Sequence, residues 1–314
     1  MLTSFRFACP LCHSDLAQIG AEMYICPTHK VTYPRKNGVW RFLPSDLNRE
    51  YQQFMQEYQS IRAAEGRGAP DSTYYRSLPF KDLSGRYGSD WNIRARSFQS
   101  LLHTVVAPLE KKLRRPLRVL DLGAGNGWLS YRLAQRGNEV SAVDLQTNSL
   151  DGLGAYIHYD AGFLPVQADF NHLPFQESQA DLVIFNASFH YSVSYVASLG
   201  EAIRILQREG QIVILDSPLY HDPDSGAKMV HEREEHFQKA YGFASNAISS
   251  KNYLTYRQLE DLGRECGIRW KLDSPFYGLS WAVRPVRARL AGRREPAQFQ
   301  VVVGQRFLPD FPEE

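Results

Sequence analysis

The sequence predicts an α/β protein built on a doubly wound, mostly parallel sheet. One segment, residues 118–145, supports most of this prediction. A short apolar strand ends in Asp121 and is followed by the glycine loop Gly-Ala-Gly-Asn-Gly. A helix over 129–135 and a second strand over 140–143, which ends in Asp144, complete a βαβ unit. Both carboxylates therefore lie at the carboxyl ends of strands, where sheets of this kind bind ligands.

Later apolar runs supply the rest of the sheet. Further strands are expected over residues 163–170, 181–185, 211–215, 268–273 and 299–304. Thr255 is the predicted N-cap of a helix that runs to Gly267, and an arginine-rich helix over 279–290 is expected between the last two strands. Together these elements form a seven-stranded sheet.

The order of the glycines indicates which nucleotide the loop binds. A dinucleotide fingerprint reads G-x-G-x-x-G and presents a helix N-terminus to a pyrophosphate. Here the loop reads D-x-G-x-G-x-G, and Asp121 would place negative charge beside that anion. S-adenosylmethionine has no phosphate and carries an ammonium and a sulfonium, which a carboxylate favours. Asp144 is placed to accept hydrogen bonds from a ribose diol.

This motif resembles the first motif of the class I, seven-stranded S-adenosylmethionine-dependent methyltransferases. The resemblance covers roughly residues 91–304. It implies a Rossmann-like fold, an adenine site at Asp169 and Phe170, and release of S-adenosylhomocysteine as product. The cofactor-binding residues that we predict are Asp121, Gly123, Ala124, Gly125, Asn126, Gly127, Asp144, Leu145, Ala168, Asp169, Phe170, Asn186 and Ala187.

The segment after the fourth strand carries the candidate catalytic residues, His190 and Tyr191. In the family this segment borders the transferred methyl group. The methyltransferases that act on exocyclic amino groups of nucleobases carry Pro-Pro-aromatic after the first residue, whereas Asn186 is followed by Ala and Ser, which disfavours that reaction. Imidazole titrates near neutrality, so His190 is a candidate general base; the alternative is that it only packs against the cofactor.

The cysteines predict a metal site. Cys9-Pro-Leu-Cys12 and Cys26-Pro-Thr-His29 form two similar pairs with the spacing of a zinc ribbon, and three thiolates with one imidazole suit structural Zn²⁺. His13 is an alternative fourth ligand, although His29 matches the symmetry of the two pairs.

The ribbon segment is similar to the N-terminal zinc module of bacterial rRNA guanine-N1 methyltransferases. It also resembles leaders on uncharacterised bacterial methyltransferases and small methyltransferase-activating proteins. Basic residues and aromatics such as Tyr33, which we expect to be exposed, are compatible with an RNA-binding face. A structural cap on the catalytic domain is equally compatible.

We divide the chain into a zinc-ribbon module (1–45), a helical connector or lid (46–90) and a methyltransferase domain (91–314) with a substrate roof over 218–250. The lid is expected to be an amphipathic helix, because apolar residues recur at helical spacing from Tyr51 to Tyr58.

Composition limits the choice of acceptor. The 314 residues are 43% hydrophobic and carry a net charge of +2, and we find neither a membrane-spanning run nor a signal peptide, which favours a cytoplasmic protein without a membrane partner. Five arginines between Arg284 and Arg294 are best explained as a solvated helix face. RNA binding depends on neutralising phosphates with basic residues, and a chain with a net charge of only +2 has little excess positive charge for this. We therefore favour a small, partly apolar metabolite over an rRNA or tRNA base as the acceptor. A third alternative is a non-catalytic cofactor-binding partner protein.

Overall fold

A single sheet organises the chain in the computed structural model, which describes residues 4–307. Its strand order is β1-β2-β3-β4-β7-β6-β5-β8-β9-β13-β12. In chain order the strands are β1 (Ala17–Gln18), β2 (Met23–Ile25), β3 (Thr32–Lys36), β4 (Val39–Arg41), β5 (Arg118–Leu122), β6 (Glu139–Asp144), β7 (Leu164–Gln167), β8 (Ala180–Asn186), β9 (Leu206–Leu215), β12 (Ile268–Asp273) and β13 (Val301–Arg306). A separate parallel pair consists of β10 (Leu219–Tyr220) and β11 (Leu254–Thr255).

The prediction of a seven-stranded, mostly parallel sheet was wrong in strand number, because the structure has an eleven-stranded mixed sheet. The strands from β4 to β9 in the spatial order pair in parallel, while β13 is antiparallel to both of its neighbours and β1 to β4 pair antiparallel. The sheet has more strands than expected because Trp40 in β4 pairs with Val166 in β7, which joins β1 to β4 to the main sheet. This pairing supplies hydrogen-bond partners to a strand that would otherwise be an exposed edge.

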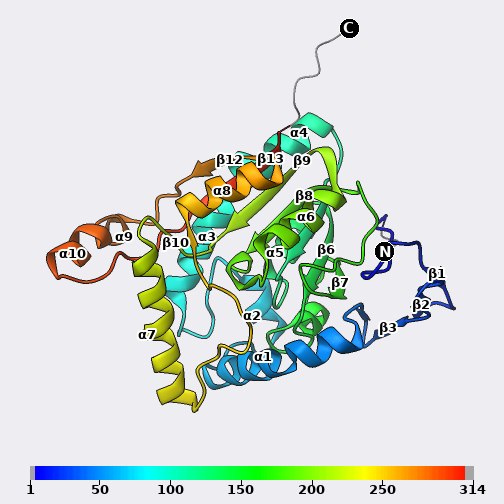
Figure 1. Ribbon diagram of the computed structural model, residues 1–314, viewed down its shortest axis with the longest axis horizontal. Coiled ribbons are helices and arrows are strands. Elements are labelled where there is room, and N and C mark those ends of the chain that lie inside the picture. The colour runs from blue at the N-terminus through cyan, green and yellow to red at the C-terminus, as the bar shows by residue number, and fades with distance from the viewer. Residues whose placement is uncertain (1–3, 308–314) are drawn as a thin grey trace, which may run out of the picture.

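Helices cover both faces of the sheet (Figure 1). They are α1 (Ser45–Ala64), α2 (Ser72–Ser77), α3 (Gly88–Leu101), α4 (Ala107–Leu113), α5 (Trp128–Gln135), α6 (Tyr195–Ile205), α7 (Pro223–Tyr241), α8 (Tyr256–Cys266), α9 (Leu279–Ala282) and α10 (Arg284–Leu290). A π-helical turn (Leu102–Val106) continues α3. Apolar residues of α6 and α8 share one core cluster with Leu120 and Leu122 of β5, whereas those of α3, α4 and α5 share the other cluster with Val119. The alternation along β5 thus sorts the helices into two layers.

Local sequence signals explain two helix boundaries. Thr255 caps α8 as predicted, in a reciprocal capping box with Gln258. The single helix expected over 279–290 is instead divided at Val283 into α9 and α10. Pro285 is the reason, because a proline has no N–H to donate and its ring clashes with the carbonyl four residues earlier.

The N-terminal segment is packed into the core of the main domain rather than standing apart from it. Phe7 contacts Trp40 and Phe42 of the same segment, with ring centroids 5.6 and 4.6 Å away, and Phe175 of the main domain at 5.6 Å. Tyr33, expected to be exposed, is only 1% exposed, because its ring stacks on Phe42 inside this cluster. A possible RNA-binding aromatic is therefore a core residue.

This shared core predicts a cooperative effect of Phe7→Ala. The substitution removes a buried ring between the N-terminal strands and the main sheet, so we expect the free energy of unfolding of the whole chain to fall by about 3–5 kcal/mol. Denaturant unfolding followed by tryptophan fluorescence measures this change. Phe276→Ala is the matched control, because Phe276 is 62% exposed. An early, separate transition of the N-terminal segment, with the main transition unchanged, would contradict a shared core.

Candidate active site

The glycine loop follows β5, which is the strand at which the order of strands across the sheet reverses. From β5 the strand order proceeds to β6 and β7 on one side and to β8 and β9 on the other. Gly123 has φ +74°, and a Cβ at this position would lie 2.2 Å from the Cβ of Ser188. A glycine is therefore required for the loop to lie against the end of β8, which leaves a crevice at the switch point.

Asp144 at the end of β6 fixes the conformation of this loop. One carboxylate oxygen accepts a hydrogen bond from the Gly125 N–H at 2.8 Å, and the other accepts one from the Gln146 N–H at 2.7 Å. Burial, only partly offset by these hydrogen bonds, raises the pKa of Asp144 to about 6. Its carboxylate reaches the first cavity described below.

Asp121 is located underneath the loop rather than in the cavity. It is fully buried, and its Oδ2 accepts a hydrogen bond from the Ser130 hydroxyl at 2.7 Å. Burial, together with the nearby charge of Asp144, raises the pKa of Asp121 to about 7. The structure therefore does not bring this predicted residue to the cavity wall. The other predicted cofactor residues that do not line the cavity are Ala124, Asn126, Gly127, Ala168 and Asn186.

The first cavity lies above the loop, and the empty space in it and in its open mouth together amounts to about 770 Å³. The predicted residues that line it are Gly123, Gly125, Asp144, Leu145, Asp169, Phe170 and Ala187. Its lining includes three carboxylates, Asp144, Asp151 and Asp169, and no lysine, arginine or histidine. This acidic lining suits a cationic ligand and disfavours a pyrophosphate.

Helix α1 closes one side of the first cavity through Tyr51, Phe54 and Tyr58, three of the four residues of the predicted apolar stripe. The Gln146 side chain holds the helix in place by donating a hydrogen bond to the Met55 carbonyl at 2.8 Å. Sequence analysis missed several lining residues, namely Gln146, Asp151, Asn171, Ser188, Ser192, Val193 and Ile248. They belong to loops and carry no motif that could have identified them.

Asp169 is held rigidly at the wall of the first cavity. Its Oδ2 lies 2.6 Å from Nδ1 of His172, and its Oδ1 accepts a hydrogen bond from the Asn171 N–H at 2.6 Å. The hydrogen bond to Asp169 raises the pKa of His172 above its ordinary value. Phe170 packs edge-on against Phe185, so the predicted adenine pair has a fixed orientation.

A second cavity of about 1520 Å³, open to solvent, adjoins the first. The two share Phe54, Tyr58, Ala187 and Tyr191 as wall residues. In Figure 1, α1 and α7 approach each other at one end of the molecule, and residues of both helices line this second space. Its lining includes six arginines, Arg62, Arg67, Arg94, Arg233, Arg284 and Arg294, but only two acids, Glu65 and Asp216.

The two candidate catalytic residues lie at the second cavity, and Tyr191 lines both cavities. Nδ1 of His190 is 3.2 Å from the Ser217 hydroxyl. Burial first, and then the positive charges of Arg233 and Arg94, lower the pKa of His190 to about 3. The imidazole is therefore neutral at physiological pH and is a weak base in the unliganded protein.

The backbone is strained where the two cavities meet. Ala187 follows β8 with φ +52°, and Asp216 follows β9 with φ +49°, in the left-handed region that non-glycine residues rarely adopt. Both residues line the second cavity. Strain of this kind clusters at functional sites, and here it occurs at the carboxyl ends of the two strands beyond the switch point.

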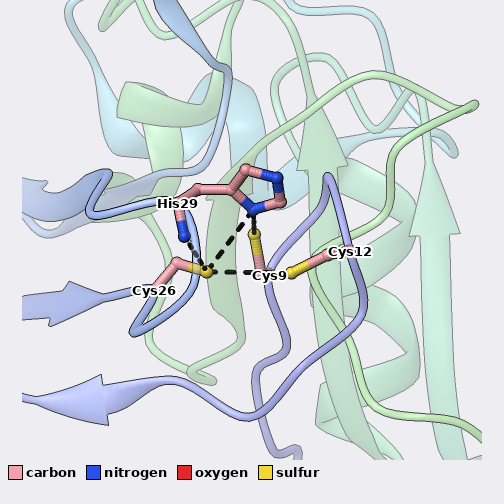
Figure 2. Close-up of side chains that lie close together, drawn as sticks. All are labelled: Cys9, Cys12, Cys26 and His29. Atoms are coloured by element: carbon pink, nitrogen blue, oxygen red, sulfur yellow. Dashed lines mark hydrogen bonds between the residues drawn. The ribbon is translucent and has the colours of Figure 1, made fainter.

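The predicted metal ligands converge in the N-terminal segment. The ligand atoms of Cys9, Cys12, Cys26 and His29 all lie within 4.8 Å of one another (Figure 2). Cys12 Sγ is 3.7 Å from Cys26 Sγ, and His29 Nδ1 is 3.7 Å from Cys26 Sγ. His13, the alternative ligand, instead places its Nε2 3.8 Å from Glu201.

Comparison with known proteins assigns the fold to a family. Residues 120–214 match the family described as "Methyltransferase domain". The demethylmenaquinone methyltransferase of Thermus thermophilus is 30% identical over 195 residues, which are 58% of this chain and 79% of that protein. The chain belongs to the class I S-adenosylmethionine-dependent methyltransferases.

Other relatives of this methyltransferase match over shorter stretches. The malonyl-[acyl-carrier protein] O-methyltransferase of Geobacter sulfurreducens is 29% identical over 131 residues, which are 40% of this chain and 48% of that protein. Among solved structures, the plantazolicin methyltransferase BpumL, in complex with a triazolic desmethylPZN analog and S-adenosylhomocysteine, is 12% identical with a TM-score of 0.47. That match covers 81% of this chain and 99% of the other. None of the helices described within 4–307 has the length and apolar character of a membrane span.

Asp144→Asn tests the cofactor site of the methyltransferase. Because the pKa of Asp144 is raised to about 6, its carboxyl is largely protonated at pH 5 and ionised at pH 7. We expect affinity for S-adenosylhomocysteine to rise over this interval, since the ionised carboxylate accepts hydrogen bonds from a ribose diol more strongly. In the variant, affinity at pH 7 should fall about ten- to hundredfold. Isothermal titration calorimetry measures both effects.

The control for this measurement is Asp46→Asn, because the side chain of Asp46 is 83% exposed on the outer surface of α1. This variant should retain both the affinity and the pH dependence of the unmodified protein. Equal affinity of Asp144→Asn and the unmodified protein at pH 7 would contradict the predicted role of Asp144.

Proposed function

We propose that the protein transfers the methyl group of S-adenosylmethionine to a small, partly apolar molecule bound in the second cavity. The observation that carries this proposal is the pair of adjoining cavities that share Ala187 and Tyr191 as wall residues. One cavity suits a cationic cofactor, and the other is large enough for a second molecule. Methyl transfer is an in-line displacement, which requires that the two molecules meet at one place.

The residues of the first cavity would hold the cofactor. Asp144 binds the ribose, and Asp169 with Phe170 holds the adenine. Gly123 and Gly125 leave room for the aminoacyl end of the cofactor. Asp121 does not contact the cofactor directly; it supports the glycine loop from beneath. S-adenosylmethionine, when bound, supplies an electrophilic methyl group on a cationic sulfur.

His190 and Tyr191 would orient the acceptor. Tyr191 lies between the two cavities and packs 4.3 Å, centroid to centroid, from the His190 ring. The neutral imidazole of His190 can accept a hydrogen bond from an acceptor hydroxyl. General-base catalysis by His190 stays a prediction, and a pKa near 3 favours the orienting role in the unliganded protein.

Several features support a small molecule as the acceptor. Its cavity is lined by apolar side chains as well as arginines, among them Met229, Phe237 and Phe299. The relatives in Thermus and Geobacter are named for demethylmenaquinone and for the malonyl group of malonyl-[acyl-carrier protein], neither of which is a nucleic acid. By contrast, the RNA alternative loses its aromatic contact because Tyr33 is buried.

We also propose that the N-terminal Cys/His cluster binds structural zinc. A tetrahedral site with Zn–S bonds of about 2.3 Å separates its sulfurs by about 3.8 Å. The 3.7 Å between Cys12 Sγ and Cys26 Sγ fits this geometry. In this proposal, residues 1–45 form a zinc-stabilised cap, residues 46–90 the lid, and residues 91–314 the catalytic domain with its roof over 218–250.

A labelled methyl-transfer assay tests the proposed reaction. Incubating the protein with labelled S-adenosylmethionine and a fractionated cell extract should place label in the small-molecule pool. At S-adenosylmethionine concentrations below saturation, Asp144→Asn should lower this labelling in proportion to its loss of cofactor affinity. Label confined to RNA would overturn the choice of acceptor. Absence of label in every pool, despite confirmed binding of S-adenosylhomocysteine, would favour the non-catalytic alternative.

Metal analysis tests the zinc proposal. We expect about one zinc per chain by mass spectrometry, and loss of the metal together with lowered thermal stability in Cys12→Ser, because a three-ligand site leaves the fold of the cap incomplete. Cys266→Ser is the matched control, since Cys266 is a free thiol outside the cluster. Equal zinc content in the two variants would contradict the assignment.

A further inference from the structure

The arginines of the second cavity fall into two groups that differ in their partners. Three of them pair with carboxylates, namely Arg62 with Asp151, Arg67 with Glu65 and Arg294 with Glu232. The remaining three, Arg94, Arg233 and Arg284, have no carboxylate within 4 Å in the described part of the chain. They come from three different helices, α3, α7 and α10, yet they line one cavity.

Arg94 has the fewest partners of the three. It is partly buried, and among residues 4–307 its guanidinium makes a cation–π contact with Trp91 at 5.1 Å but no hydrogen bond. Arg233 donates one hydrogen bond to Asn252 Oδ1 at 3.2 Å, while its buried Nε has no partner. A partly buried guanidinium without a paired carboxylate is suited to an anion that arrives with a ligand.

The positive charge of this group extends to the place where we expect the methyl acceptor. Both Arg233 and Arg94 lower the pKa of His190 by charge repulsion. One acid in the wall, Asp216, interacts electrostatically with Arg94, and its Oδ1 already accepts a hydrogen bond from Ser97. Burial raises the pKa of Asp216, which disfavours its ionised form.

We infer that the methyl acceptor carries an anionic group, a carboxylate or a phosphate, which Arg94 and Arg233 bind, with Arg284 in the wall of the same cavity. This inference rests on the proposed function and names its substrate class. The apolar side chains of Met229 and Phe237 would contact the uncharged body of the molecule. Guanidinium groups suit this task because they bind carboxylates and phosphates through two parallel hydrogen bonds.

Binding of simple amphiphiles to the protein saturated with S-adenosylhomocysteine tests this inference. The probes are octanoate, octyl phosphate and the neutral octanol, measured by calorimetry. We expect both anions to bind at least about tenfold more tightly than octanol, and Arg94→Gln and Arg233→Gln each to weaken anion binding by about tenfold or more. A preference between the two anions identifies the headgroup as carboxylate or phosphate.

Arg287→Gln is the matched control. It removes one positive charge from the exposed surface of α10, three residues from Arg284, at a position that does not line the cavity. Anion binding in this variant should stay within about twofold of the unmodified protein. Equal binding of octanol and octanoate, or anion binding unchanged in both cavity variants, would overturn the inference.

The same titrations separate this inference from the proposed function. Arg94→Gln and Arg233→Gln should bind S-adenosylhomocysteine as the unmodified protein does, because neither residue lines the first cavity. If S-adenosylhomocysteine fails to bind the unmodified protein, the proposed function fails. If it binds and the anions show no preference over octanol, only the present inference fails.

Discussion

The proposed active site depends on one electrostatic contrast, the opposite charge of two cavities that share a wall. The first is lined by Asp144, Asp151 and Asp169 without a basic side chain, and the second is lined by six arginines and two acids. Arg62 connects them, since it lines the second cavity and pairs with Asp151 of the first. A cationic cofactor and an anionic acceptor would each find the complementary cavity, and the shared wall would keep their reacting ends together.

The fold explains why the two cavities lie side by side. The switch point places the ends of β5 and β6 around the first cavity, and the ends of β8 and β9 lead into the second. Helix α1 serves both, because Phe54 and Tyr58 line both spaces. The N-terminal strands extend the sheet beyond β7 and share its core, and among the described residues those of β1 to β4 are absent from the lining of both cavities.

Sequence analysis predicted the part of the site that local patterns encode. The glycine loop and Asp144 are contiguous with strands of clear apolar character, and the stripe of α1 follows helical spacing. The pairing of β4 with β7 was not predictable in this way, because β4 has three residues and no alternation long enough to show. Asp121 was placed in the cavity by its motif, but its burial beneath the loop depends on Ser130 in α5.

The arginine-lined cavity was missed for a physical reason. Arg94, Arg233 and Arg284 are separated by more than a hundred residues in the first interval and about fifty in the second, so only the tertiary structure brings them together. The arginines from 284 to 294 were interpreted as a solvated face, and Arg287, Arg289 and Arg293 are indeed exposed. Arg284 and Arg294, however, line the cavity.

A crystal structure of the protein with S-adenosylhomocysteine and octanoate would test the central claim most directly. The account predicts the adenosyl group against Asp144 and Asp169, and the carboxylate on the guanidinium groups of Arg94 and Arg233. The sulfur should point toward the wall formed by Ala187 and Tyr191. Density for S-adenosylhomocysteine among the arginines, or for octanoate among the three carboxylates, would contradict it.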